Sequence, residues 1–123
     1  MARSTEEDIN EFLSTIQEVA KSSFTLVQRK ENKETLLCLG FNDKVVKEVI
    51  NQLTIEDYCE GPSQDPKYNL QSWIFGKAIN NREVYIKLQK SHFNDPGDEI
   101  ETLYCISFHF SKEPLNYPYK NKR

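Results

Sequence analysis

Three side chains in the second half of this 123-residue chain have the types and spacing for acid–base chemistry on a phosphate: Tyr85, Lys87 and His109. Tyr85 and Lys87 are two residues apart in an alternating segment, so they share one face of a strand. His109 lies in the next such segment. If the connection is centred near residue 97, antiparallel pairing sets Tyr85 opposite His109 and Lys87 opposite Ser107. Opposed side chains have Cβ atoms about 5 Å apart, so the spacing predicts a cluster.

Such a cluster suits the cleavage of RNA without a metal ion. In this reaction the 2′-hydroxyl attacks the neighbouring phosphorus and expels the 5′-oxygen, which requires a base, an acid and positive charge. We expect His109, with an ordinary pKa of about 6.5, to provide the acid–base chemistry. Lys87 would offset the phosphate charge and Tyr85 would orient the substrate. Trp73 and Tyr119 are candidates for stacking on splayed-out bases of single-stranded RNA.

The charge distribution adds candidates for binding the RNA backbone. Residues 1–65 hold seven Lys or Arg and thirteen Asp or Glu, net −6, whereas residues 66–123 hold nine and six, net +3. A basic half beside an acidic half indicates one side that faces a polyanion. Lys77, Arg82 and Lys120 are therefore predicted to hold phosphates. Ordinary surface lysines with a frayed tail explain the same charges equally well.

A sheet must position these side chains. Apolar and polar residues alternate over residues 73–79, 83–90 and 100–111, which predicts three strands of an antiparallel meander. Asn80 and Asn81 predict a tight hairpin between the first two strands, and residues 94–98 have the composition of a longer turn before the third.

Alternation also predicts which side chains face the helices. Val84, Ile86 and Leu88 should form the apolar face of the middle strand. In the last strand the apolar face is predicted at positions 104, 106, 108 and 110, with Cys105 opposite, beside Ser107.

Helical periodicity dominates the first half. A cap at Ser4 or Thr5 predicts a helix to about residue 21, followed by a short strand over 24–28. A helix over 33–39 should end at Gly40, a third should begin at residue 42 or 43, and Thr54 should cap a short turn. The Gly- and Pro-containing residues 61–66 should interrupt regular structure.

The predicted fold class is therefore α+β, with N-terminal helices packed on an antiparallel meander. One domain should span residues 1–123, with a helical half over about 1–60, a sheet half over about 70–111 and an extended tail over 112–123.

The composition limits the cellular compartment and the cofactors that we expect. Hydrophobic residues make up 37% and charged residues 28% of the chain, and no apolar run is long enough to cross a bilayer. The acidic start is unlike a signal peptide, so we expect a cytoplasmic protein without a membrane partner. Three widely spaced cysteines and two histidines offer few metal ligands, so we expect no metal and no cofactor.

Less specific interpretations remain open for each residue. Tyr85 and Lys87 could be surface residues of an exposed sheet face, and His109 a structural histidine. His92 lies beside a predicted loop and suggests no function. The whole domain could also bind RNA or a protein without catalysing a reaction.

Several strings together resemble the MqsR family of toxins over roughly residues 36–119. They are LLCLGF at 36–41, LTIEDYCEGPSQD at 53–65, WIFG at 73–76, EVYIKL at 83–88, ISFH at 106–109 and PLNYPY at 114–119. The resemblance implies a fold related to RelE-type toxins and a sequence-selective mRNA interferase, an endoribonuclease that is independent of the ribosome. It also implies a cognate antitoxin as partner, besides mRNA.

The resemblance also bears on single residues. The family's catalytic tyrosine falls on Tyr85, and the lysine of its last strand falls on His109, in a Ser-Phe-His form that looks like a recurring variant. A further lysine and a glutamine of the family fall on Glu60 and Ile74, so this chain departs from the pattern there. The alternative implied by these departures is a non-catalytic RNA- or antitoxin-binding domain of the same fold.

Overall fold

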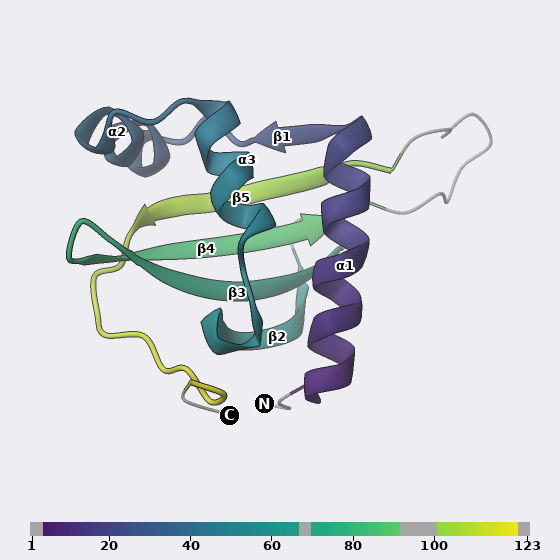
Figure 1. Cartoon of the computed structure of the whole chain (residues 1–123). Coiled ribbons are helices and arrows are strands. Elements are labelled where there is room, and N and C mark those ends of the chain that lie inside the picture. Colours follow the sequence, from purple (N-terminus) through teal and green to yellow (C-terminus); the bar gives the residue numbers. More distant parts are fainter. Residues whose placement is uncertain (1–3, 67–69, 92–100, 121–123) are drawn as a thin grey trace.

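The computed structural model describes residues 4–66, 70–91 and 101–120. Within them the chain forms three α-helices, one short 3-10 helix and five strands (Figure 1). In chain order these are α1 (Glu6–Ser22), β1 (Phe24–Leu26), α2 (Lys30–Leu39), α3 (Asp43–Asn51), η1 (Ile55–Asp57), β2 (Tyr58–Asp65), β3 (Leu70–Ile79), β4 (Arg82–Lys90) and β5 (Leu103–Phe110).

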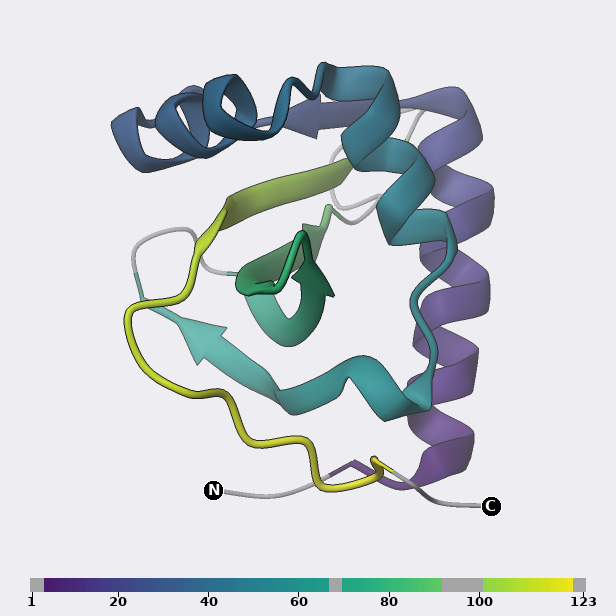
Figure 2. The same ribbon diagram turned by 60° about the vertical axis from the view of Figure 1, so that its left-hand side comes forward.

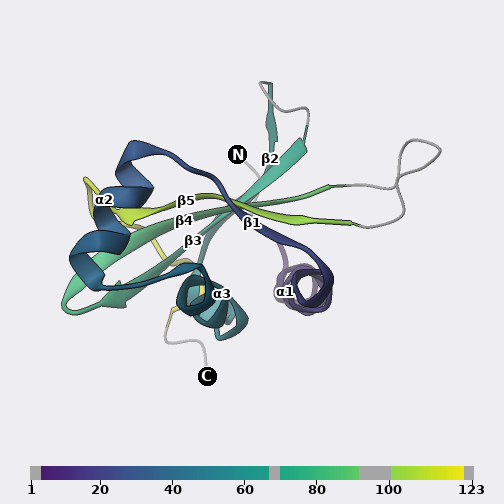
Figure 3. The same ribbon diagram turned by 90° about the horizontal axis from the view of Figure 1, so that it is seen from above.

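The five strands form one sheet in the order β1-β5-β4-β3-β2. Strands β2 to β5 make an antiparallel meander, and β1 pairs with β5 in parallel. Helices α1 and α3 lie on the same side of the sheet, while α2 packs against β5 (Figure 3). The predicted α+β class is thus confirmed, with a mixed and mostly antiparallel sheet.

Helix α1 follows from its cap and its apolar stripe. The hydroxyl of Thr5 accepts a hydrogen bond from the Asp8 backbone N–H at 3.1 Å, and three acidic residues occupy the first turn, where the helix dipole favours negative charge. One turn after another then contributes a buried side chain, from Ile9, Leu13, Ile16 and Ala20. This stripe packs α1 onto the sheet.

The hydrophobic core lies between this helix layer and one face of the sheet. The prediction for β4 is confirmed, because Val84, Ile86 and Leu88 are fully buried in it. Phe75 and Phe108 flank Ile86 in the neighbouring strands and are also fully buried. Each such side chain contributes about 1.5–3 kcal/mol relative to exposure, so the core fixes which face of each strand remains for function.

The hairpin predicted between β3 and β4 is present. Asn80 and Asn81 have φ angles of 52° and 66°, the left-handed conformations that a tight two-residue turn with matching twist requires. The capping box predicted at Thr54 is also present, with Asp57 accepting from the Thr54 backbone N–H at 2.9 Å. Local sequence signals therefore set both turns.

The faces predicted for part of β5 were wrong. Lys87 pairs with Ser107, but Leu88 pairs with Cys105, so Ile106 is an extra residue at a β-bulge. Cys105 therefore lies in the main hydrophobic cluster, and Tyr104 does not. A one-residue bulge reverses the faces on one side of it only, which is why the predicted faces hold from Ser107 onward.

The interruption predicted at residues 61–66 was also wrong in part, because β2 continues to Asp65. The strand contains a positive φ at Gly61, a cis Gly61–Pro62 bond and two register shifts. β2 is an edge strand, where a missing backbone donor and bulges are tolerated. Helix α2 begins at Lys30, three residues earlier than predicted.

The chain after β5 forms neither helix nor strand over the described residues 111–120, in agreement with the predicted extended tail. It runs along the outside of the sheet towards the start of α1, where the Tyr119 hydroxyl donates to the Ser4 carbonyl at 2.6 Å (Figure 2). Glu83 holds its middle, accepting from the Leu115 backbone N–H at 3.1 Å and from the Tyr117 hydroxyl at 2.8 Å. The tail is thereby fixed over the β3–β4 end of the sheet.

The predicted turn at 94–98 and His92 lie outside the described residues. None of the helices that the structure describes is both long and apolar enough to cross a lipid bilayer.

Candidate active site

The central pairing predicted for the site is confirmed. In the register of β4 and β5, Tyr85 is opposite His109 and Lys87 is opposite Ser107. The Tyr85 and His109 rings are stacked, with centroids 5.3 Å apart and planes inclined by 19°. All four residues lie on the sheet face opposite the α1–α3 layer, because their strand neighbours Ile86 and Phe108 are in the core.

The orientation of the His109 ring leaves one nitrogen available. Its Nδ1 lies 3.1 Å from the carbonyl oxygen of Phe110, which can only accept a hydrogen bond. In the neutral ring Nδ1 therefore carries the proton and donates it to Phe110. Nε2 is then an unprotonated acceptor, as a general base requires.

Lys87 is held in place by acidic and polar neighbours. Its Nζ lies 3.3 Å from Oδ2 of Asp65, and the Gln89 amide donates to the same oxygen at 3.0 Å. The Gln89 amide also donates to the Ser72 hydroxyl at 2.7 Å. Only 26% of the Lys87 side chain is exposed. The contacts fix the ammonium group near Tyr85, but Asp65 offsets part of its charge.

Arg29 belongs to the site although the sequence analysis did not include it. It is the N-cap residue of α2, and its Nη1 donates to the Ser107 hydroxyl at 3.0 Å. The position follows from the parallel pairing of β1 with β5, which carries the chain after Leu26 alongside β5. The alternation of polar and apolar residues does not reveal that β1 pairs with β5, so nothing in the sequence pattern distinguished Arg29 from the other arginines.

Tyr85 is suited to donate a hydrogen bond rather than to remove a proton. Burial raises the pKa of its hydroxyl, and the carboxylate of Glu60 adds to that rise. The phenol therefore stays neutral at physiological pH, with an O–H that can be directed at a phosphate or hydroxyl oxygen.

These side chains line a groove of about 610 Å³ between β4, β5 and the tail. Its walls are formed by Arg29, Glu31, Tyr85, Lys87, Ser107, His109, Ser111, Lys112, Glu113, Pro114 and Leu115. A second hollow of about 300 Å³ lies towards β2 and shares Tyr85 and Lys87 with the groove. An extended polymer could therefore occupy both depressions and cross the sheet at these two residues.

The two positions that depart from the MqsR pattern are neighbours of the site. Ile74 pairs with Glu60 on one side and with Lys87 on the other. The positions of the family's lysine and glutamine are therefore occupied here by the carboxylate of Glu60 and the apolar side chain of Ile74. Arg29 brings a positive charge to the same face from another element.

Two predicted RNA-binding residues of β3 do not lie with this cluster. Trp73 pairs with Leu88, so it faces the helix layer, where it stacks on Phe12 with ring centroids 4.2 Å apart. Lys77 pairs with a core residue and forms an ion pair with Asp57 at 3.4 Å.

The remaining three also lie elsewhere. Arg82 stacks over the ring of Phe110 at 3.5 Å. Tyr119 is bonded to Ser4 at the far end of the tail, and Lys120 is exposed beside it. The structure thus brings together Tyr85, Lys87 and His109, but not the five candidates for backbone or base contacts.

The described part of the chain contains no group of three or more His, Cys, Asp or Glu residues arranged to hold a metal ion. Its three cysteines are free thiols, with Cys38 exposed, Cys59 half-buried and Cys105 buried. Burial raises the pKa of Cys59 to about 12 and also raises that of Cys105, so neither is an activated nucleophile.

Comparison of the chain with known protein families, with curated proteins and with solved structures gives no match.

Proposed function

We propose that this protein is a metal-independent endoribonuclease that cleaves single-stranded mRNA, acting as the toxin of a toxin–antitoxin pair. The observation that supports the proposal is the groove in which His109 stacks on Tyr85. Lys87 lies on the same face, two residues along β4 from Tyr85, the residue that pairs with His109. Base, hydrogen-bond donor and cation are the groups that 2′-hydroxyl attack needs.

The reaction proceeds as a transesterification. Nε2 of His109 accepts the proton of the 2′-hydroxyl as the bond from O2′ to phosphorus forms. The bond from phosphorus to O5′ then breaks, and the departing 5′-oxygen takes a proton from water in the open groove. The products are a 2′,3′-cyclic phosphate and a 5′-hydroxyl.

Positive charge for the phosphorane comes from two elements. Lys87 approaches from β4, and Arg29 from the start of α2 through its bond with Ser107. Arg29 compensates for the lysine that the MqsR pattern would have at Glu60. A planar guanidinium binds two phosphate oxygens at once, which suits the role.

The toxin role and the antitoxin partner rest on the resemblance, which covers the strands that carry Tyr85, Lys87 and His109. A second candidate function is supported by one observation: Asp65 and Glu60 reduce the net charge around Lys87 and Tyr85. On that basis the alternative is a domain that binds RNA or an antitoxin without cleaving.

The test compares wild-type protein with His109→Ala and with Lys44→Ala, an exposed control on α3. Each is incubated with RNA in the presence of a chelator, and each is expressed in cells. We expect the wild type and Lys44→Ala to cut RNA and arrest growth, and His109→Ala to do neither. An active His109→Ala variant would remove the assignment, and wild-type binding without cleavage would support the alternative.

A further inference from the structure

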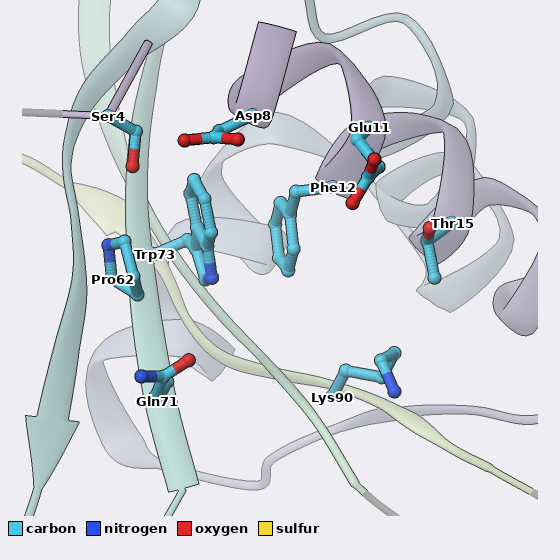
Figure 4. Close-up of a pocket in the computed structure, with 9 residues that line it drawn as sticks. All are labelled: Ser4, Asp8, Glu11, Phe12, Thr15, Pro62, Gln71, Trp73 and Lys90. Atoms are coloured by element: carbon cyan, nitrogen blue, oxygen red, sulfur yellow. The ribbon is translucent and has the colours of Figure 1, made fainter.

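A cavity of about 330 Å³ lies on the other side of the sheet from the groove, between α1 and strands β2 and β3 (Figure 4). Trp73 lines it and faces the helix layer. The remaining lining residues are Ser4, Asp8, Glu11, Phe12, Thr15, Pro62, Gln71 and Lys90. None of these residues belongs to the groove, so the cavity is a separate feature of the molecule.

One face of α1 supplies carboxylates to this cavity. Asp8, Glu11, Phe12 and Thr15 follow one another at three- and four-residue steps and so lie along the same side of the helix. Neither Asp8 nor Glu11 forms an ion pair with any residue that the structure describes. The one basic residue of the lining, Lys90, is paired with Glu101. Within the described residues, the cavity therefore carries two exposed carboxylates that no basic side chain pairs.

The indole of Trp73 provides a second, independent sign of a ligand. Its ring stacks on Phe12 and makes an edge contact with Tyr58, and only 9% of the residue is exposed. Its Nε1–H makes no hydrogen bond with any described residue. Figure 4 shows this nitrogen at the end of the ring that faces the space between Gln71 and Lys90. None of the fully buried side-chain nitrogen or oxygen atoms of the described residues lacks a partner, so this N–H is open to the cavity. A group bound in the cavity can therefore accept its hydrogen bond.

We propose that this cavity binds an arginine residue of a basic polypeptide partner. The guanidinium has five donors in one plane, which matches two carboxylates a helical turn apart, and its stem and plane pack favourably on aromatic rings. The main-chain carbonyl of the bound residue accepts the Trp73 N–H. Free arginine fits less well, because its own carboxylate is repelled by Asp8 and Glu11. The proposal does not depend on the ribonuclease assignment.

Ligand binding in the cavity can be followed by tryptophan fluorescence, because Trp73 is the one tryptophan of the chain. The intact protein is titrated with the blocked peptide acetyl-Gly-Arg-Gly-amide while tryptophan emission is recorded. Matched peptides contain lysine or citrulline, the neutral isostere of arginine, and spermidine is titrated separately. We expect a saturable change with the arginine peptide, at least tenfold weaker binding of the citrulline peptide, and intermediate binding of the lysine peptide.

Variants localise the site. The double change Asp8→Asn and Glu11→Gln should weaken the arginine peptide at least tenfold, whereas Glu18→Gln, on the same helix but outside the cavity, should leave binding unchanged. Circular dichroism checks that each variant is folded. Absence of saturation, equal binding of the citrulline peptide, or no effect of the double change would overturn the proposal. Saturation by spermidine but not by the peptide would also overturn it in favour of a small-cation site.

Discussion

Asn32 links the start of α2 to the bulge in β5, and its removal tests how the site is held in shape. The side chain is 1% exposed. Its amide nitrogen donates to the carbonyls of Val27 at 2.9 Å and Ile106 at 3.0 Å, and its amide oxygen accepts from the Phe108 N–H at 2.9 Å. The change Asn32→Ala therefore leaves the Ile106 carbonyl and the Phe108 N–H without these partners, whereas the Val27 carbonyl still accepts from the Arg29 N–H at 3.0 Å.

The expected cost follows from the number of groups involved. A buried polar group that loses its partner costs about 1–3 kcal/mol. For these two groups together we expect Asn32→Ala to lower the free energy of unfolding by about 2–5 kcal/mol. That is a large part of the roughly 5–15 kcal/mol that stabilises an ordinary domain.

Equilibrium unfolding in urea measures the difference directly. Asn10→Ala, an exposed change on α1, is the matched control and should stay within about 0.5 kcal/mol of wild type. RNA cleavage by the folded Asn32→Ala protein should also fall. Asn32 holds the Val27 carbonyl, and Arg29, two residues further along the chain, donates to Ser107 in the groove. A loss of stability below about 1 kcal/mol would show that Asn32 does not hold the bulge in place.

Three further predictions concern the tail, a buried thiol and the candidate site. Gly76→Ala should loosen the tail and speed its cleavage in limited proteolysis, because a Cβ there would lie 2.5 Å from the ends of the Leu115 and Tyr117 side chains and would displace the Tyr117 hydroxyl from Glu83. An unchanged cleavage rate would contradict this. The pKa of Cys59 is about 12 when folded, so its thiol ionises first in the unfolded chain and stability should fall as pH rises from about 9 to about 12. Cys59→Ser should show a shallower fall in urea titrations across that range, and an identical slope would be the contrary result. Tyr85→Phe should slow RNA cleavage about 2- to 10-fold, the value of one hydrogen bond, with no change in its pH profile below the ordinary tyrosine pKa, because the pKa of Tyr85 is raised.

Much of the framework was predictable because it depends on short-range signals. The cap at Thr5, the αL residue Gly40 and the Asn80–Asn81 turn each act within a few residues. The pairing of Tyr85 with His109 was also predictable, since alternation and a connection assumed to be centred near residue 97 determine an antiparallel register.

The remaining features depend on long-range contacts. The bulge at Ile106 coincides with hydrogen bonds to Asn32, which is 74 residues away, so strand alternation in β5 gave no sign of it. Arg29 reaches the groove because β1 pairs in parallel with β5. That pairing depends on long-range packing, which the alternation of residues does not reveal. Residues 61–65 join an edge strand despite Pro62, because only a central strand excludes proline.

The chemistry of the cut ends distinguishes metal-independent 2′-hydroxyl attack from hydrolysis by water. Wild-type protein is given a single-stranded RNA in the presence of a chelator, the cut site is mapped, and a matched oligonucleotide with a 2′-deoxy sugar at that position is tested. We expect a 2′,3′-cyclic phosphate and a 5′-hydroxyl, no cut in the 2′-deoxy substrate, and no cut by His109→Ala. Cleavage of the 2′-deoxy substrate, or products that carry a 5′-phosphate, would contradict 2′-hydroxyl attack.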